Sequence, residues 1–216
     1  MRCFGLARNL FLITIKKTRE QQKQETRQNI INAAFSCLDA EKSLSSISLR
    51  EIARVAGIAP TSFYRHFKDV NDLGMTLVDE AGLMLRQLMR SARRRITADS
   101  NAIDISVDTL MEFISENKNV FRVLLREHTG TSAEFRSAVQ REIQHFIKEL
   151  SDYIMHRQQI SQQLADLQSE AMVMIVFSAG AQALDAQPNQ QFVIAEKVKY
   201  QLMFVQLGVK QFKPKP

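Results

Sequence analysis

Apolar residues recur every three to four positions along most of this chain, which is the spacing of one face of an α-helix. The pattern predicts helices at about residues 18–40, 49–56, 60–67, 70–96, 103–113, 119–126, 133–156, 166–184 and 192–207. No run of alternating apolar and polar residues indicates a strand, and no glycine-rich phosphate loop or internal repeat is present. The sequence therefore predicts an all-α protein of about nine helices.

The segment 48–68 has the residue pattern of a helix-turn-helix. Its first short helix carries one narrow apolar stripe, formed by Leu49, Ile52, Ala53 and Ala56. Ser48 precedes the stripe and Glu51 follows three residues later, so the two are expected to form a capping box. Gly57 permits a tight turn, and Pro60 suits the first position of a second helix. The pattern predicts two helices that meet at a sharp corner.

The second helix, 60–67, is expected to bury Phe63 and Phe67 one turn apart and to expose hydrogen-bonding side chains on its other faces. Such side chains on a compact helix reach base edges and phosphates in the major groove of DNA. A helical corner of this kind is sometimes purely structural, but its polar outward face favours DNA recognition. We predict a DNA-binding surface made of Ser48, Arg50, Pro60, Thr61, Ser62, Tyr64, Arg65, His66 and Lys68.

Charge is distributed unevenly along the chain. Residues 1–95 contain 17 Lys and Arg against 9 Asp and Glu, whereas residues 96–216 contain 12 against 14. The net charge is therefore +8 in the first part and −2 in the second, as expected for a nucleic-acid-binding module followed by a domain with another role. Cys3 and Cys37 have no metal-ligand spacing, and two isolated cysteines are typical of a reducing cytoplasm.

These observations divide the chain into three parts. We expect a poorly ordered extension at 1–17, a helix-turn-helix DNA-binding domain at 18–85 with its corner at 48–67, and a ligand-binding and dimerisation domain at 86–216. The apolar run 9–15 is too short to span a bilayer and is followed by no small-residue cleavage site, which disfavours a membrane role.

The two last predicted helices indicate how the protein assembles. The helix at 166–184 lacks a polar face for nearly three turns, and the helix at 192–207 is also unusually apolar. A helix that is apolar all round is buried or lies in an interface. We expect the two helices to form half of a four-helix bundle in a homodimer.

The second part is also rich in methionine and phenylalanine, which suit both an ordinary core and an adaptable apolar pocket. On the residues alone both interpretations stay open. Arg122 and Arg126, one turn apart, would either receive an anionic or thioester head group or pair with Glu127 or Glu134. If a pocket forms, the residues expected to line it are Phe113, Phe121, Arg122, Leu125, Arg126, Phe146, Met172 and Phe177.

The sequence contains no pattern typical of catalysis. Its four histidines are scattered without metal-ligand spacing, and no Ser or Cys lies in a nucleophile motif, so we expect neither an enzyme nor a metal or cofactor site. The basic run 93–95 at the end of the helix 70–96 is either a solvated helix terminus or a patch that faces DNA or a partner.

Two segments, 26–38 and 48–73, resemble the N-terminal domain of the TetR family of bacterial transcription regulators. The resemblance covers about a quarter of the chain, and it departs from the usual pattern only at Ser43, where glycine is usual, and at Ile47, where threonine is common. Together with segments 79–90, 121–136, 141–147 and 170–185, the chain looks like the fatty-acid biosynthesis repressors of proteobacteria. The resemblance implies a repressor of unsaturated fatty acid synthesis genes that binds a palindromic operator and senses a long-chain acyl thioester, acyl-CoA or acyl carrier protein.

Three alternatives share some of these features. A TetR-family regulator of another regulon would sense a different hydrophobic effector with the same N-terminal domain. An architectural DNA-binding protein would have a second part packed too tightly to admit a ligand. A helical acyl-processing enzyme would need a catalytic constellation, which the sequence does not contain.

Overall fold

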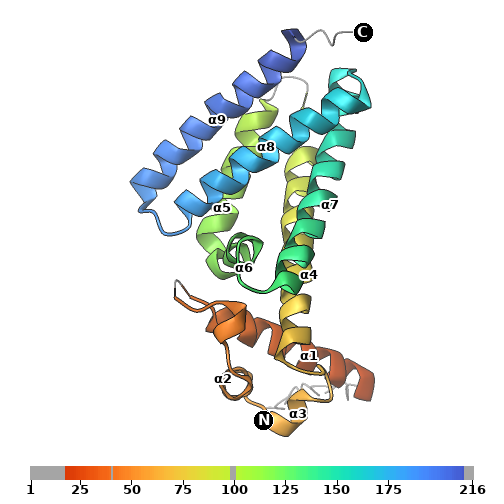
Figure 1. The fold of residues 1–216 in the computed structure, drawn as a ribbon, viewed down its shortest axis with the longest axis vertical. Coiled ribbons are helices and arrows are strands. Elements are labelled where there is room, and N and C mark those ends of the chain that lie inside the picture. The colour runs from red at the N-terminus through yellow and green to blue at the C-terminus, as the bar shows by residue number, and fades with distance from the viewer. Residues whose placement is uncertain (1–17, 40, 98–100, 212–216) are drawn as a thin grey trace, which may run out of the picture.

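The computed structural model describes residues 18–39, 41–97 and 101–211 (Figure 1). Over these residues the chain forms nine α-helices, one short 3-10 helix (η1, Leu44–Ser46) and no strand, which confirms the predicted all-α class. The helices are α1 (Arg19–Cys37), α2 (Leu49–Val55), α3 (Pro60–Phe63), α4 (Val70–Arg94), α5 (Ala102–Glu116), α6 (Lys118–His128), α7 (Ala133–Gln158), α8 (Gln162–Ala183) and α9 (Pro188–Gln211). The expected extension at 1–17 lies outside the described residues.

The helices α1, α2 and α3 form a small domain at the lower end of the molecule in Figure 1. Its core includes Phe63 and Phe67, which are buried as predicted, with their ring centroids 5.6 Å apart. Two contacts hold α1 against the corner: the Asn29 side-chain amide donates a hydrogen bond to the Ala56 carbonyl oxygen at 2.7 Å, and the Arg27 guanidinium lies 4.8 Å from the centroid of the Phe67 ring. The orientation of α3 is therefore set by α1.

The turn between α2 and α3 has the predicted chemistry. Gly57 has a φ of 67°, the left-handed region that favours glycine, and Pro60 is the first residue of α3. The capping box predicted for α2 forms only in part. The Ser48 side chain accepts the backbone N–H of Glu51 at 3.2 Å, but the Glu51 carboxylate pairs with the Lys42 ammonium at 2.6 Å instead of returning to the helix cap.

The helix predicted at 60–67 is shorter than expected. Regular α-helix ends at Phe63, and the chain continues as a turn in which Arg65 and His66 each donate a backbone hydrogen bond to the residue three positions earlier. Such bonds are typical of the tighter 3-10 geometry. The segment 60–67, which is predicted to read DNA and is called the reading element below, is therefore one helical turn followed by a tight turn.

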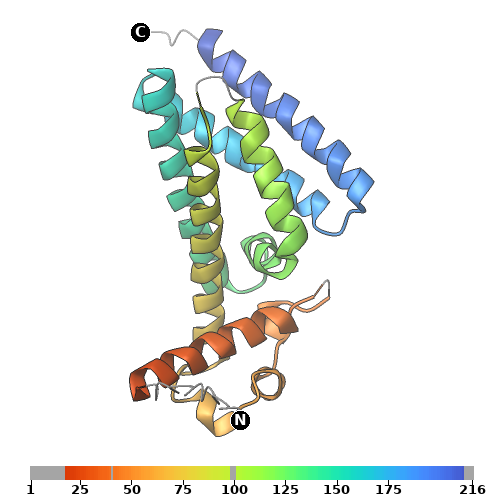
Figure 2. The same ribbon diagram turned by 180° about the vertical axis from the view of Figure 1, so that it is seen from behind.

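A single 25-residue helix, α4, is shared by the two parts of the molecule. It begins beside α1 and runs upward along α7, and it also packs against α5 and α6 (Figures 1 and 2). The domain boundary predicted at residues 85 and 86 falls inside this helix, where the backbone is unbroken. The DNA-binding and C-terminal parts are thus connected by a rigid element.

A second connection between the two parts runs through α6. The carboxylate of Glu127 is buried, and its Oε1 atom accepts the backbone N–H of Leu44 in η1 at 3.1 Å. Burial raises the pKa of Glu127, whereas the hydrogen bond from Leu44 and the charge of Arg126 lower it. Removing this carboxylate would leave the buried N–H without a partner, so the contact fixes η1 to α6.

The helices α8 and α9 pack together, and α9 lies at the outer edge of the upper part in both views (Figures 1 and 2). Pro188 is the first residue of α9, a position that suits proline because its backbone is preset for the first turn of a helix. Of the helices in the described residues, α8 is the one that is long and apolar enough to cross a membrane by length and composition. Core helices meet the same criteria, and 44% of its apolar window is buried inside the protein.

A prediction concerns the close approach of α6 and α8. A Cβ atom at Gly180 would lie 2.4 Å from Cε1 of Phe121, whose ring is fully buried and cannot move aside freely. We expect Gly180→Ala to destabilise the protein by about 1–3 kcal/mol through overpacking. The control is Gly208→Ala in α9, where nothing lies within 4 Å of the added Cβ and the helix propensity of alanine contributes about 0.5–1 kcal/mol of stability. Urea unfolding measures both, and equal effects of the two substitutions would contradict the assigned contact.

Candidate DNA-binding surface and ligand cavity

The residues predicted to contact DNA lie on an accessible part of the N-terminal domain. Of the nine, Ser62 and His66 are half-buried and the other seven are exposed. Tyr64 is 62% exposed although its ring stands edge-on against the buried Phe63, with 5.7 Å between centroids. Because α3 lies at the end of the molecule farthest from α8 and α9 (Figure 1), the C-terminal part does not cover this surface.

His66 has a different character from the charged residues around it. Burial lowers the pKa of His66, and the neighbouring charges of Lys23, Arg27 and Arg65 lower it further. Its Nδ1 atom is buried and has no hydrogen-bond partner among the described residues. The imidazole is therefore neutral near pH 7, and it contributes hydrogen bonding rather than charge to the surface.

An apolar cavity lies inside the C-terminal part, between α4, α5, α7, α8 and α9, with one residue from α6. Its volume is about 130 Å³. A buried water needs roughly 10–15 Å³ on this scale, so the cavity has room for on the order of ten groups of the size of a water or a methylene. The apolar side chains that line it include Leu85, Met89, Val107, Leu110, Phe121, Phe146, Leu150, Met172, Val173, Val176, Phe177 and Leu202.

The structure brings together only some of the predicted ligand residues. Four of them line the cavity: Phe121, Phe146, Met172 and Phe177. Phe113 and Leu125 do not line it and pack, half-buried, against the main hydrophobic core. A cavity therefore lies in this part of the protein, but its walls include only half of the residues predicted to line a pocket.

The expectation that Arg122 or Arg126 lies at the mouth of the pocket needs correction, because neither lines the cavity. The buried guanidinium of Arg122 forms an ion pair with Asp185 at 2.8 Å. Arg126 instead borders a small depression beside Leu44 of the N-terminal domain. The polar face of α6 thus points toward the DNA-binding part.

Sequence reasoning missed the polar residues that do line the cavity. They are Arg93, Ser106, Tyr153, Arg157, Gln158 and Gln206. Arg93 belongs to the basic run 93–95, which was expected to be a solvated terminus or an outward patch. Only Arg94 and Arg95 are exposed, whereas the Arg93 side chain is 12% exposed and lies 5.7 Å from the centroid of the Tyr153 ring. Its register on α4, one turn after Met89, was the available signal.

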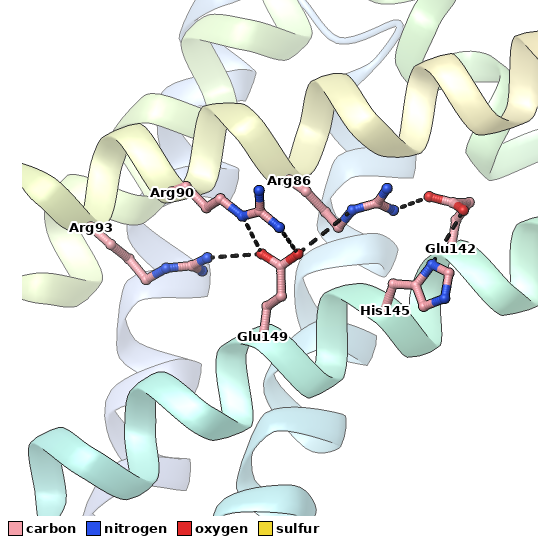
Figure 3. Close-up of polar contacts among 6 residues, drawn as sticks. All are labelled: Arg86, Arg90, Arg93, Glu142, His145 and Glu149. Atoms are coloured by element: carbon pink, nitrogen blue, oxygen red, sulfur yellow. Dashed lines mark hydrogen bonds and ion pairs between the residues drawn. The ribbon is translucent and has the colours of Figure 1, made fainter.

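Arg93 also belongs to a charged cluster between α4 and α7 (Figure 3). Glu149 of α7 accepts hydrogen bonds from both Nε and Nη2 of Arg90, and Nη2 of Arg93 lies 3.4 Å from Glu149 Oε2. Burial lowers the pKa of Arg93, and the charge of Glu149 opposes this effect. Within the cluster, Arg86 pairs chiefly with Glu142, so three arginines share two carboxylates.

The described part of the chain contains no group of three or more His, Cys, Asp or Glu residues that would hold a metal ion. An exposed helical corner and an apolar cavity are joined by one long helix, which is the arrangement of a helix-turn-helix DNA-binding protein with a separate helical domain.

Comparison with known proteins gives a match for the helix-turn-helix segment. Residues 30–73 match the family described as "Bacterial regulatory proteins, tetR family". This segment contains the helix-turn-helix, so that part of the chain is similar to the N-terminal domain of TetR-family transcriptional regulators.

Solved structures of TetR-like regulators have a similar fold over nearly their whole length. The fatty acid degradation regulator FadR from Bacillus halodurans has a TM-score of 0.65 at 17% identity, covering 87% of this chain and 96% of that one. FadR from Bacillus subtilis in complex with stearoyl-CoA has a TM-score of 0.60 at 16% identity, covering 81% and 96%. A TetR-like regulator from Rhodococcus has a TM-score of 0.64 at 13% identity, covering 91% and 100%. At these identities the likeness concerns the fold.

A prediction distinguishes two kinds of DNA contact. Tyr64→Ala should weaken binding to the operator by about 1–3 kcal/mol if the side chain reads a base, and should leave nonspecific binding nearly unchanged. Lys68→Ala should weaken specific and nonspecific binding alike and lower the salt dependence, because it removes a phosphate contact. The control is Lys148→Ala, which removes the same charge from an exposed site on α7. Gel-shift titrations at several salt concentrations measure each effect, and unchanged affinity in both test variants would refute the assigned surface.

Proposed function

We propose that this protein is a cytoplasmic, homodimeric repressor of unsaturated fatty acid biosynthesis genes, whose operator affinity changes when a long-chain acyl thioester binds. The observation that carries the proposal is the apolar cavity, whose wall includes Leu85 and Met89 of α4. Since α4 also begins beside the DNA-binding helices, a ligand in the cavity contacts the element that positions them.

The character of the cavity supports an acyl ligand. Its walls are aliphatic and aromatic, and Met89 and Met172 add flexible side chains that adapt to a chain of variable shape. A cis double bond bends a chain at a fixed position, so a curved cavity distinguishes unsaturated from saturated chains through packing alone. The FadR structure with stearoyl-CoA is an example of a protein of this fold that holds an acyl thioester.

The proposed dimer rests on the outer faces of α8 and α9. Large apolar side chains lie exposed at helical spacing on both: Leu167 and Met174 on α8, and Phe192, Val193, Tyr200, Phe204 and Leu207 on α9. So many exposed large apolar side chains on two neighbouring helices are unusual on a monomer and typical of an interface. Two copies joined through 166–184 and 192–207 would form the four-helix bundle expected from the sequence.

In such a dimer the two reading elements would contact half-sites about one helical turn of DNA apart (~34–36 Å) or slightly more. A ligand that prefers one spacing of these elements shifts operator affinity by its differential binding to the two arrangements, typically 1–3 kcal/mol. Because this coupling is reciprocal, the operator changes the affinity for the ligand by the same factor as the ligand changes the affinity for the operator.

A prediction tests the ligand. Each buried methylene contributes about 0.8 kcal/mol, so the affinity for acyl thioesters should rise roughly fourfold per methylene until the cavity is full. Val176→Phe, which places a larger side chain in the wall, should shorten the optimal chain. The control is Leu125→Phe, which enlarges a half-buried side chain outside the cavity. Calorimetry with saturated and monounsaturated thioesters, with and without operator DNA, measures each.

The proposal fails if no thioester binds, or if thioesters bind without changing operator affinity. Operator binding together with a response to a different hydrophobic compound would identify a TetR-family regulator of another regulon. Turnover of the thioester would instead identify the helical acyl-processing enzyme.

A prediction tests the dimer. Phe204 is 69% exposed and Met174 is 53% exposed, so their replacement by glutamate leaves the protomer's own core intact. Phe204→Glu and Met174→Glu should give monomers with much weaker operator binding. Leu83→Glu changes an apolar residue of α4 that is 39% exposed and lies outside the proposed interface, and this variant should remain dimeric. Light scattering at micromolar concentration decides, and a monomeric wild-type protein would contradict the proposed assembly.

A further inference from the structure

The cavity ends in polar side chains that neither DNA binding nor an apolar chain uses. Arg93 of α4 and Tyr153, Arg157 and Gln158 of α7 all line it, near the C-terminal ends of their helices. We propose that these four residues, the head-group site, bind the thioester group of an acyl ligand together with the amide and anionic groups that follow it. The proposal rests on the ligand class of the proposed function and replaces Arg122 and Arg126 as the recognition residues.

Two buried polar atoms of this site have no hydrogen-bond partner among the described residues: the Tyr153 hydroxyl and Oε1 of Gln158. A buried polar group without a partner costs free energy, so such groups point to a missing partner. The Tyr153 hydroxyl donates to an acceptor such as a thioester carbonyl. Gln158 Oε1 needs a donor, and the carrier arm of a CoA or acyl carrier protein thioester has an amide N–H shortly after the sulfur.

The charges of the head-group site favour an anion. The described residues that line the cavity include Arg93 and Arg157 and no Asp or Glu. Glu149, the acidic group nearest Arg93, already accepts two hydrogen bonds from Arg90, and its contact with Arg93 is the longer one at 3.4 Å (Figure 3). A guanidinium that is largely desolvated and only partly neutralised interacts strongly with a ligand's oxygen atoms.

The head-group site also reaches the protein surface. Tyr153 and Arg157 border the cavity on one side and an open depression with Asp152 and His156 on the other. Arg157 is exposed and donates a hydrogen bond to the Thr97 carbonyl oxygen at 3.2 Å. Asp152, the acidic residue of the depression, pairs with Lys148 at 2.9 Å. The arm that joins the bound thioester to a bulky carrier would therefore pass out of the protein beside the Arg157 cation. This opening lies at the end of the molecule far from the DNA-binding domain.

The test compares three probes with the same chain: oleoyl-CoA, oleate and uncharged methyl oleate. The affinity for oleoyl-CoA should fall roughly 10- to 100-fold in Arg93→Gln and in Arg157→Gln, because each loses a charge-assisted hydrogen bond. It should fall less in Tyr153→Phe, which loses a neutral hydrogen bond. The two arginine variants should bind methyl oleate within about threefold of wild type, since that probe offers no anion, whereas Tyr153→Phe should weaken the binding of both probes because methyl oleate keeps a carbonyl acceptor. The matched control is Arg126→Gln, which lies on the polar face of α6 outside the cavity.

Calorimetry gives the affinities, and thermal unfolding shows that each variant is folded. Arg157 is exposed, so its substitution separates recognition from folding even if Arg93→Gln is unstable. If wild-type protein binds oleoyl-CoA and the three test variants bind it equally well, or if Arg126→Gln alone loses affinity, the head-group site is refuted and the proposed function stands. Arg93-dependent binding of oleate without binding of oleoyl-CoA would refute the thioester ligand. Failure of the wild-type protein to bind any of the three probes would overturn both proposals.

Discussion

The continuity of α4 is the constraint on which the rest of this structure depends. One unbroken helix from Val70 to Arg94 packs beside α1 at its start and forms part of the cavity wall further along. Because hydrogen bonds within the helix resist bending, the two parts cannot reorient at a flexible linker. The buried hydrogen bond between Glu127 and Leu44 adds a second attachment, so movement of the DNA-binding domain must involve both α4 and α6.

Most of the fold could be predicted from local sequence signals. Helical spacing of apolar residues identified all nine α-helices of the described residues, and Gly57 and Pro60 identified the corner because their backbone preferences are intrinsic. The errors occurred where a non-local partner competes. Glu51 leaves its capping box for Lys42, and Phe67 packs under Arg27 after the helix has already ended at Phe63.

The two sites differ in how well sequence predicts them. The residues predicted to contact DNA lie within one short segment, where local periodicity largely decides which side chains are exposed. The cavity combines side chains from six helices, so its lining depends on helix rotations that no local pattern records. Periodicity placed Arg122 on a polar face of α6 but could not show that this face meets Asp185, nor that Arg93 turns inward beside Tyr153.

The position of the cavity along α4 has a mechanical consequence. Roughly 25 Å of helix separates the turns bearing Leu85 and Met89 from Val70, at about 1.5 Å per residue. A tilt of about 5° around the cavity moves the far end by roughly 2 Å. In a dimer the two opposite displacements add to roughly 4 Å, which exceeds the rise of one base pair, about 3.4 Å. For the proposed acyl ligand and dimer, α4 would act as a lever that converts the shape of a few methylene groups into a mismatch of about one base-pair step between protein and operator.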